Sequence, residues 1–164
     1  MDAIDLLESQ HDEVKDLFEQ IEGAALPAEK FALFQKIADN LAAHATIEEK
    51  IFYPAIYTGE LNDKLYEAVE EHLAAKRIVA DVLEMGDASD EDVFTAKVKV
   101  LKEEFEHHVE QEEGDMFQRM RETMSDRELE MYGAQMEAMF VELMQGDPRN
   151  DFPNETAQAA PPPK

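Results

Sequence analysis

Residues 44–54 read His-Ala-Thr-Ile-Glu-Glu-Lys-Ile-Phe-Tyr-Pro, and residues 108–113 read His-Val-Glu-Gln-Glu-Glu. In both stretches a glutamate, Glu48 or Glu112, follows a histidine by four residues. Residues four apart lie on one face of an α-helix, so each stretch presents an imidazole nitrogen and a carboxylate oxygen to the same side. Both stretches therefore predict helices that carry a polar, metal-ligating type of face.

The spacing of apolar residues predicts helices along most of the chain. It has a 3.6-residue period up to about residue 145 and no sustained alternation typical of strands. Glycine, proline and capping residues divide the pattern into expected helices over residues 2–22, 27–53, 60–85, 89–123 and 125–145. Ser125 and Glu128 form a capping box at the start of the last helix, whereas Ser89 with Asp92 gives a weaker start signal.

Length and connection pattern predict one all-α domain. The chain has 164 residues, of which 44% are hydrophobic, enough to bury a core without covalent staples. Short connections between long helices favour antiparallel neighbours, so we expect an up-down-up-down four-helix bundle with a short fifth helix over residues 1–145. Residues 146–164 are rich in proline and polar residues, and we expect them to form a disordered, flexible C-terminal tail.

Composition argues against several classes of function. The 39 acidic side chains exceed the 15 lysines and arginines, giving a formal net charge of -24. Such a charge opposes electrostatic binding to nucleic acid or to an anionic membrane surface. The chain has no cysteine, which excludes disulfides, thiolate metal sites and iron–sulfur clusters. It also lacks a basic leader and any apolar stretch near the ~20 residues that span a bilayer, so we expect a cytoplasmic protein.

Four of the five histidines fall on the apolar stripes that are expected to form the core. Each stripe places one histidine among apolar residues, and two stripes add a glutamate one turn later. At three- and four-residue spacing, the stripes are Ile4, Leu7, His11, Val14, Phe18, Ile21; Ile37, Leu41, His44, Glu48, Ile51, Ala55; Leu65, Val69, His72, Lys76, Val79, Leu83; and Phe94, Val98, Leu101, Phe105, His108, Glu112.

These polar side chains together indicate a metal centre. A single histidine on an apolar stripe is more often a hydrogen-bonded core residue, but that explanation does not extend to four histidines at matching positions. Unpaired buried carboxylates are costly and are usually paired, protonated or bound to metal. Four imidazoles and two carboxylates suit two cations, and iron, manganese and zinc all accept such ligands. The alternative is a metal-free bundle with buried His–Glu pairs.

The order of these residues resembles the hemerythrin-like, HHE cation-binding family: one His, His-x3-Glu, one His, His-x3-Glu. The resemblance covers residues 1–145 and implies a non-haem di-iron centre bridged by carboxylates and an oxo or hydroxo group. Carried over by position, it implies six metal ligands: His11 and His44 for one ion, His72 and His108 for the other, and Glu48 and Glu112 as bridges.

The chain departs from the oxygen-carrying hemerythrins at two positions. Those proteins have a second histidine one turn after the third-helix histidine, where this chain has Lys76, and an aspartate where it has Glu112. A charged lysine beside two cations is repelled, so Lys76 is expected to extend to solvent, lose its proton or pair with an acid such as Glu71 or Glu112. A more open metal environment fits sensing, peroxide or nitric oxide chemistry, or iron handling better than reversible oxygen storage.

The resemblance therefore implies a di-iron protein that binds or senses small oxidants (dioxygen, peroxide or nitric oxide) or handles iron. Two alternatives are a di-iron peroxidase-like enzyme and an iron-responsive adaptor or structural bundle. The last helix is rich in methionine and either docks over the end of the bundle or offers a surface for a protein partner or a homodimer. These methionines are Met131, Met136, Met139 and Met144.

Some neighbouring side chains have two possible roles each. His107 lies off the stripe and is expected at the surface, with a role at the metal centre as the alternative. Glu49 and Glu113 are expected to be solvated acids, or else partners of the ligand histidines. Tyr53 either packs at the rim of the bundle or supplies a phenol near the centre.

Overall fold

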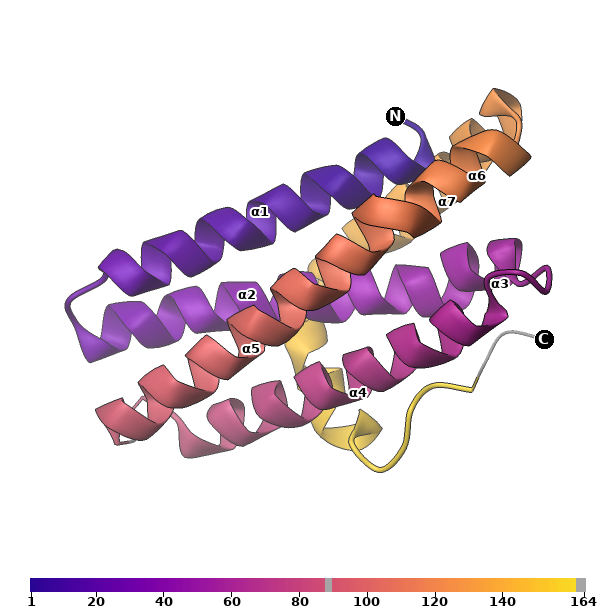
Figure 1. Ribbon diagram of the computed structural model, residues 1–164. Helices are drawn as coiled ribbons and strands as arrows, with labels where there is room; N and C mark the ends of the chain where they lie inside the picture. The colour runs from indigo at the N-terminus through magenta and orange to yellow at the C-terminus, as the bar shows by residue number, and fades with distance from the viewer. Residues whose placement is uncertain (88–89, 162–164) are drawn as a thin grey trace.

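The computed structural model describes residues 1–87 and 90–161, and its described residues form helices and loops without strands (Figure 1). The long helices α1, α2, α4 and α5 lie side by side, while α7 packs against α1 and α2. The α-helices are α1 (Ala3–Gly23), α2 (Pro27–Ile47), α3 (Tyr53–Ile56), α4 (Asn62–Met85), α5 (Glu91–Gln111), α6 (Phe117–Thr123) and α7 (Asp126–Met144). No helix among these described residues is long and apolar enough to cross a membrane.

Side-chain caps fix where several helices begin. The predicted capping box is confirmed: the Ser125 hydroxyl accepts from the Glu128 backbone N–H, and the Glu128 carboxylate accepts from the Ser125 backbone. Asp90 caps α5 by accepting from two backbone N–H groups of its first turn. The predicted cap at Ser89 lies outside the described residues.

Two π-helical turns interrupt the second and fourth predicted helices. The turn η1 (Glu48–Phe52) joins α2 to α3, and η2 (Glu112–Met116) joins α5 to α6. Each π-turn inserts one residue into the α-helical register, so the buried face is shifted beyond it. The predicted core positions Ile51 and Ala55 are therefore wrong in register: both are only half-buried, and Phe52, Tyr53 and Ile56 are buried instead.

The apolar core has two parts, with the histidines between them. One part contains the start of α1, including Ile4 and Leu7, together with residues that follow the two π-turns. The other contains the second half of α1, including Val14 and Phe18, together with the middle of α2 and α5. His11 lies between Leu7 and Val14 in the sequence, so the polar layer crosses the middle of the molecule.

The expected disordered C-terminal tail is wrong for residues 148–155. They form a 3-10 helix, η3 (Pro148–Glu155), which packs against α2 and α4. The physical reason is that Phe152 is buried in the core, and that Arg149 forms an ion pair with Asp39 of α2. Asp147 has a left-handed φ of 51°, which turns the chain back after α7. Residues 162–164 lie outside the described part of the chain.

Gly133 of α7 packs closely against the backbone of residues 1–3, which leads to a testable prediction. A Cβ at this position would lie 2.6 Å from the Met1 carbonyl oxygen and 2.8 Å from the Ala3 backbone nitrogen. Because backbone gives way less readily than a side chain, Gly133→Ala is expected to lower the free energy of unfolding by about 1–3 kcal/mol. Thermal melting beside Gly23→Ala, where the added Cβ meets nothing within 4 Å, tests this. Equal melting temperatures for the two variants would contradict it.

Candidate metal centre

Six side chains meet in the interior of the molecule, from α1, from α2 with η1, from α4, and from α5 with η2. They are the residues that the sequence predicts as metal ligands: His11 of α1, His44 of α2, His72 of α4, His108 of α5, and Glu48 and Glu112 at the first positions of η1 and η2. All six are buried, and both carboxylates have 0% exposure. Each carboxylate is the first residue of a π-turn, so its four-residue spacing from His44 or His108 is still that of the preceding α-helix.

The carboxylates lie among the Nε2 atoms of the histidines. Glu48 has Oε1 at 3.1 Å from His44 Nε2 and Oε2 at 3.0 Å from His72 Nε2. Glu112 Oε1 lies 2.5 Å from His108 Nε2 and 3.8 Å from His11 Nε2. Each carboxylate therefore reaches histidines of two different helices.

The ligand-type atoms form two adjoining groups, each with all its atoms within 4.8 Å of one another. The first group contains His11, His44, Glu48 and Glu112, and the second contains Glu48, His72 and His108. Glu48 belongs to both groups, as expected of a carboxylate that bridges two ions. The pairing of the histidines is also the one that the family resemblance implies, while their role as ligands stays a prediction.

All four histidines are oriented by a hydrogen bond at their other ring nitrogen. In each, Nδ1–H donates to a side-chain oxygen at 2.7–3.0 Å, which turns the Nε2 atom toward the centre. The accepting residues are Glu113 for His11, Gln10 for His44, Glu49 for His72 and Glu71 for His108. Glu49 and Glu113 therefore serve as partners of histidines and are not simply solvated acids.

Several buried atoms of the centre have no hydrogen-bond partner within residues 1–87 and 90–161. They are His11 Nε2, His44 Nε2, Glu48 Oε1 and both carboxylate oxygens of Glu112. With the Nδ1 protons engaged elsewhere, the two imidazole nitrogens can only accept. An unsatisfied buried polar group costs about 1–3 kcal/mol, more if it is charged. A set of buried lone pairs facing one another is the environment that a bound cation satisfies, so these residues fit a metal centre.

Protonation of the centre follows from the closeness of the two carboxylates. Burial opposes ionisation of Glu48, but the imidazoles of His44, His108 and His72 hold its pKa well below the ordinary value. Burial raises the pKa of Glu112 to about 7, and the negative charge of Glu48 adds to the increase. Although burial opposes an imidazolium, the carboxylates around His108 raise its pKa well above the ordinary value. Without a cation, the centre therefore retains protons.

Metal uptake is consequently expected to depend on pH. Below about pH 7 an incoming cation must displace the Glu112 proton, so affinity should fall about tenfold per pH unit for each proton released. Titrations with a divalent metal from about pH 6 to about pH 8 measure this slope. In Glu112→Gln, whose amide does not titrate, the slope should be shallower although the affinity is lower. An affinity independent of pH in the parent chain would contradict this assignment of protons.

Lys76 is buried, with 3% exposure, next to the centre. Its ammonium lies 2.9 Å from Glu49 Oε1 and 3.1 Å from Glu155 Oε1 of η3. The expected pairing with Glu71 or Glu112 is therefore wrong, although pairing with an acid is observed. Through Glu49, this lysine is linked to the side chain that orients His72.

Tyr53 is fully buried and supplies a phenol to the centre. Its O–H donates to Glu48 Oε2 at 3.0 Å, and its oxygen lies 3.4 Å from His72 Nε2. Burial and the carboxylate charges around it raise its pKa well above the ordinary value, so the hydroxyl keeps its proton. Packing at the rim of the bundle is therefore the wrong interpretation for this tyrosine.

His107 lies at the surface, as expected from its position off the stripe. Its side chain is 58% exposed, and its Nε2 lies 3.0 Å from the Gln111 amide nitrogen and 3.3 Å from Glu71 Oε2. It contacts the centre only through Glu71, which accepts from His108.

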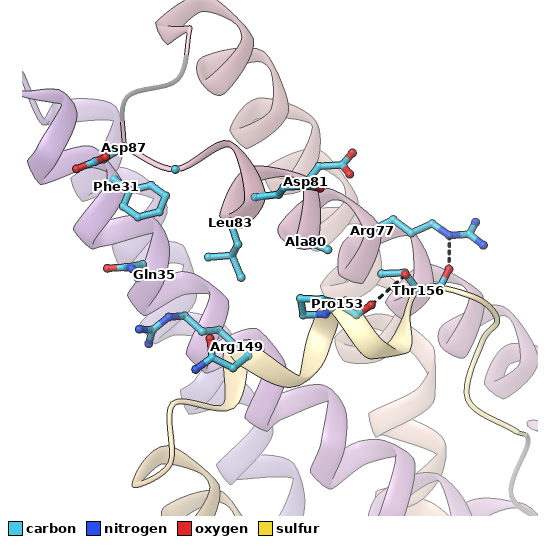
Figure 2. Close-up of a pocket in the computed structure, with 13 residues that line it drawn as sticks. Phe31, Gln35, Arg77, Ala80, Asp81, Leu83, Asp87, Arg149, Pro153 and Thr156 are labelled. Carbon is cyan, nitrogen blue, oxygen red and sulfur yellow. Dashed lines mark hydrogen bonds between the residues drawn. The ribbon is translucent and has the colours of Figure 1, made fainter.

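A small cavity adjoins the histidines. Its volume is about 30 Å³, enough for a molecule of the size of water. Its walls include His44, His72 and His108 from the centre, and apolar side chains of α2, α4, α5 and η3: Leu41, Ala75, Phe105 and Phe152. A solvent-open groove of about 1030 Å³ lies between α2, α4 and η3 and contains none of the six candidate ligands (Figure 2).

Comparisons with known proteins agree with the helical fold. Residues 2–120 match the family described as Hemerythrin HHE cation binding domain. A crystal structure of a hemerythrin HHE cation binding domain-containing protein from Mycobacterium kansasii superposes with a TM-score of 0.75, at 27% identity over 88% of each chain. A curated DNA nickase from Nostoc sp. (strain PCC 7120) is 25% identical over 145 residues, or 88% of this chain. The match spans only 41% of that relative's length.

Proposed function

We propose, from the premise that this chain belongs to the hemerythrin HHE cation-binding family, that its buried centre binds two iron ions and presents them to small oxidants: dioxygen, peroxide or nitric oxide. The observation that carries this proposal is the convergence of four oriented imidazoles on two buried carboxylates, one of which belongs to both ligand groups. Manganese or zinc would suit the same donor atoms.

The protein's own groups have distinct tasks in this proposal. The four Nδ1 hydrogen bonds hold the imidazoles in one tautomer, and the carboxylates of Glu48 and Glu112 balance the cationic charge. Bound iron supplies the change of valence that reduction of an oxidant requires. Tyr53 holds a proton beside Glu48, in a position to donate it as negative charge develops on the small ligand.

The size and charge of the surroundings support a small ligand. A cavity of about 30 Å³ beside three of the histidines is large enough for a molecule of about the size of water, which suits a small ligand. Nicking of DNA is not proposed for this chain, because a net charge of -24 opposes contact with a phosphate backbone.

Anaerobic loading with ferrous iron, followed by addition of each oxidant, tests the proposed function. A single stoichiometric oxidation of the centre would indicate binding or sensing. Loss of many equivalents of peroxide per chain would instead indicate a peroxidase-like enzyme. A fully loaded centre that stays ferrous and spectroscopically unchanged with all three oxidants would overturn the proposal.

Tyr53→Phe isolates the role of the buried proton. The variant keeps the ring and its packing but removes the hydroxyl that donates to Glu48. We expect the iron content to be retained, while the rate of oxidation by peroxide falls about tenfold or more, because a positioned proton donor is lost. Stopped-flow absorbance on the loaded protein measures this rate. An unchanged rate would show that Tyr53 takes no part.

A further inference from the structure

The C-terminal segment, residues 147–157, includes the 3-10 helix η3, which lies against α2 and α4 (Figure 1). We call this segment the C-terminal clamp. Its 3-10 helix packs on both α2 and α4, which themselves have few direct contacts with each other. The clamp therefore covers the junction between α2 and α4 beside the candidate metal centre.

Phe152 is the side chain of the clamp that packs at this junction. It is only 2% exposed and belongs to the same apolar core as Leu41 and Phe105. It also forms part of the wall of the small cavity that contains His44 and His72. The Phe152 ring therefore forms the part of the cavity wall that lies on the side of the clamp.

Polar contacts fasten the clamp on either side of Phe152. Before it, the Arg149 backbone N–H and guanidinium donate to the Asp39 carboxylate of α2 at 3.1 and 2.8 Å. After it, Arg77 of α4 donates to the Thr156 carbonyl at 3.0 Å, as Figure 2 shows. The aromatic ring is thus held between two fastened points.

A third contact links the clamp to the centre itself. The buried Lys76 ammonium bridges Glu155 of the clamp and Glu49, and Glu49 accepts from His72 Nδ1. Lifting the clamp removes one of the two carboxylates that neutralise Lys76. The ammonium is then left with Glu49 alone, so the position of the clamp and the orientation of His72 are coupled through one side chain.

We propose that the C-terminal clamp gates the metal centre, with Phe152 as the stopper that admits only small molecules and restricts release of metal. This inference rests on the proposed function, since it concerns access to the same centre. The groove of about 1030 Å³ beside Arg149, Pro153 and Thr156 is open to solvent, so this side of the clamp is not covered by another element.

The rate at which a bulky ferrous chelator extracts iron from the loaded, full-length protein tests the gate. Phe152→Ala is expected to raise this rate about tenfold or more, because the barrier to local opening is lowered. Arg149→Ala, which weakens a fastening point without changing the cavity wall, is expected to raise it by a smaller factor. The matched control is Phe34→Ala, which removes the same ring from the same core but not from the cavity.

Two results would overturn the gate: no acceleration of iron extraction in Phe152→Ala, or equal acceleration in Phe34→Ala, which would reflect lost stability alone.

Failure of the proposed function is seen separately, as failure of the parent chain to load iron. In that case the gate is tested on metal-free protein by the rate at which diethyl pyrocarbonate modifies His44 and His72. The exposed His107 is the internal reference. Phe152→Ala should raise the ratio of the modification rate of His44 and His72 to that of His107 about tenfold, whereas an unchanged ratio would refute the gate.

Discussion

Replacing Glu48 with alanine is expected to abolish tight binding of both metal ions. Glu48 is the residue shared by the two ligand groups, with one oxygen near His44 and the other near His72. In the proposed centre, its removal would take a ligand from each ion and half of the negative charge of the two buried carboxylates. By contrast, His44→Ala removes a ligand from one group only and should reduce the metal content mainly at that position.

Elemental analysis of each purified variant measures this difference. We expect the parent chain to hold about two ions and Glu48→Ala to hold almost none, since loss of a shared carboxylate affects both positions. Glu112→Ala should also lower the content sharply. Glu110→Gln, which alters an exposed glutamate on the same helix as His108, is the control and should match the parent. Unchanged metal content in both Glu48→Ala and Glu112→Ala would contradict the assignment of the centre.

Removal of the metal is expected to lower the melting temperature by about 10 °C or more. Binding at about a thousandfold above Kd stabilises the folded state by about 4 kcal/mol, and each kcal/mol shifts the melting temperature by about 2–4 °C in a domain of this size. The structural reason is that buried acceptors such as Glu48 Oε1 and His44 Nε2, which the proposed metal would satisfy, are left without a partner in the metal-free protein. Calorimetry with and without a chelator measures the shift.

The same experiment has a pH dependence of known sign. The folded-state pKa of Glu112 is raised to about 7 and that of His108 is also raised, so metal-free protein binds extra protons when folded. The stability from these protons is present at lower pH and lost as the pH rises through about 7. The gap between loaded and metal-free protein should therefore widen from about pH 6 to about pH 8. A narrowing gap would contradict this protonation of the centre.

The sequence predicts the interior of the centre well because its signal is periodic. His11, His72 and His108 fall in phase with apolar neighbours, and this phase alone places them on the buried face of their helices. The start of each π-turn preserves the four-residue spacing of His44 and Glu48, so that pair also lies as expected. The register after the turn cannot be predicted in the same way, because the apolar pattern before the turn does not indicate that a residue is inserted.

The parts that sequence reasoning missed depend on contacts between distant segments. A proline-rich composition indicates disorder, yet Phe152 and Arg149 are enough to fasten the clamp to α2. A disordered tail offers no partner to a buried side chain, so the sequence gives no sign of the ion pair between Glu155 and Lys76. Glu49 was expected in solvent because it faces away from the ligands of its own helix, but its partner, His72, comes from α4.

The amount of metal bound per chain tests the central claim most directly. Freshly purified protein, without added metal, should contain about two iron ions per chain by elemental analysis, since the buried atoms form two groups that share Glu48. The absence of bound metal, even after anaerobic reconstitution with ferrous iron, would contradict the account and leave the buried histidines and carboxylates as a structural hydrogen-bonded layer.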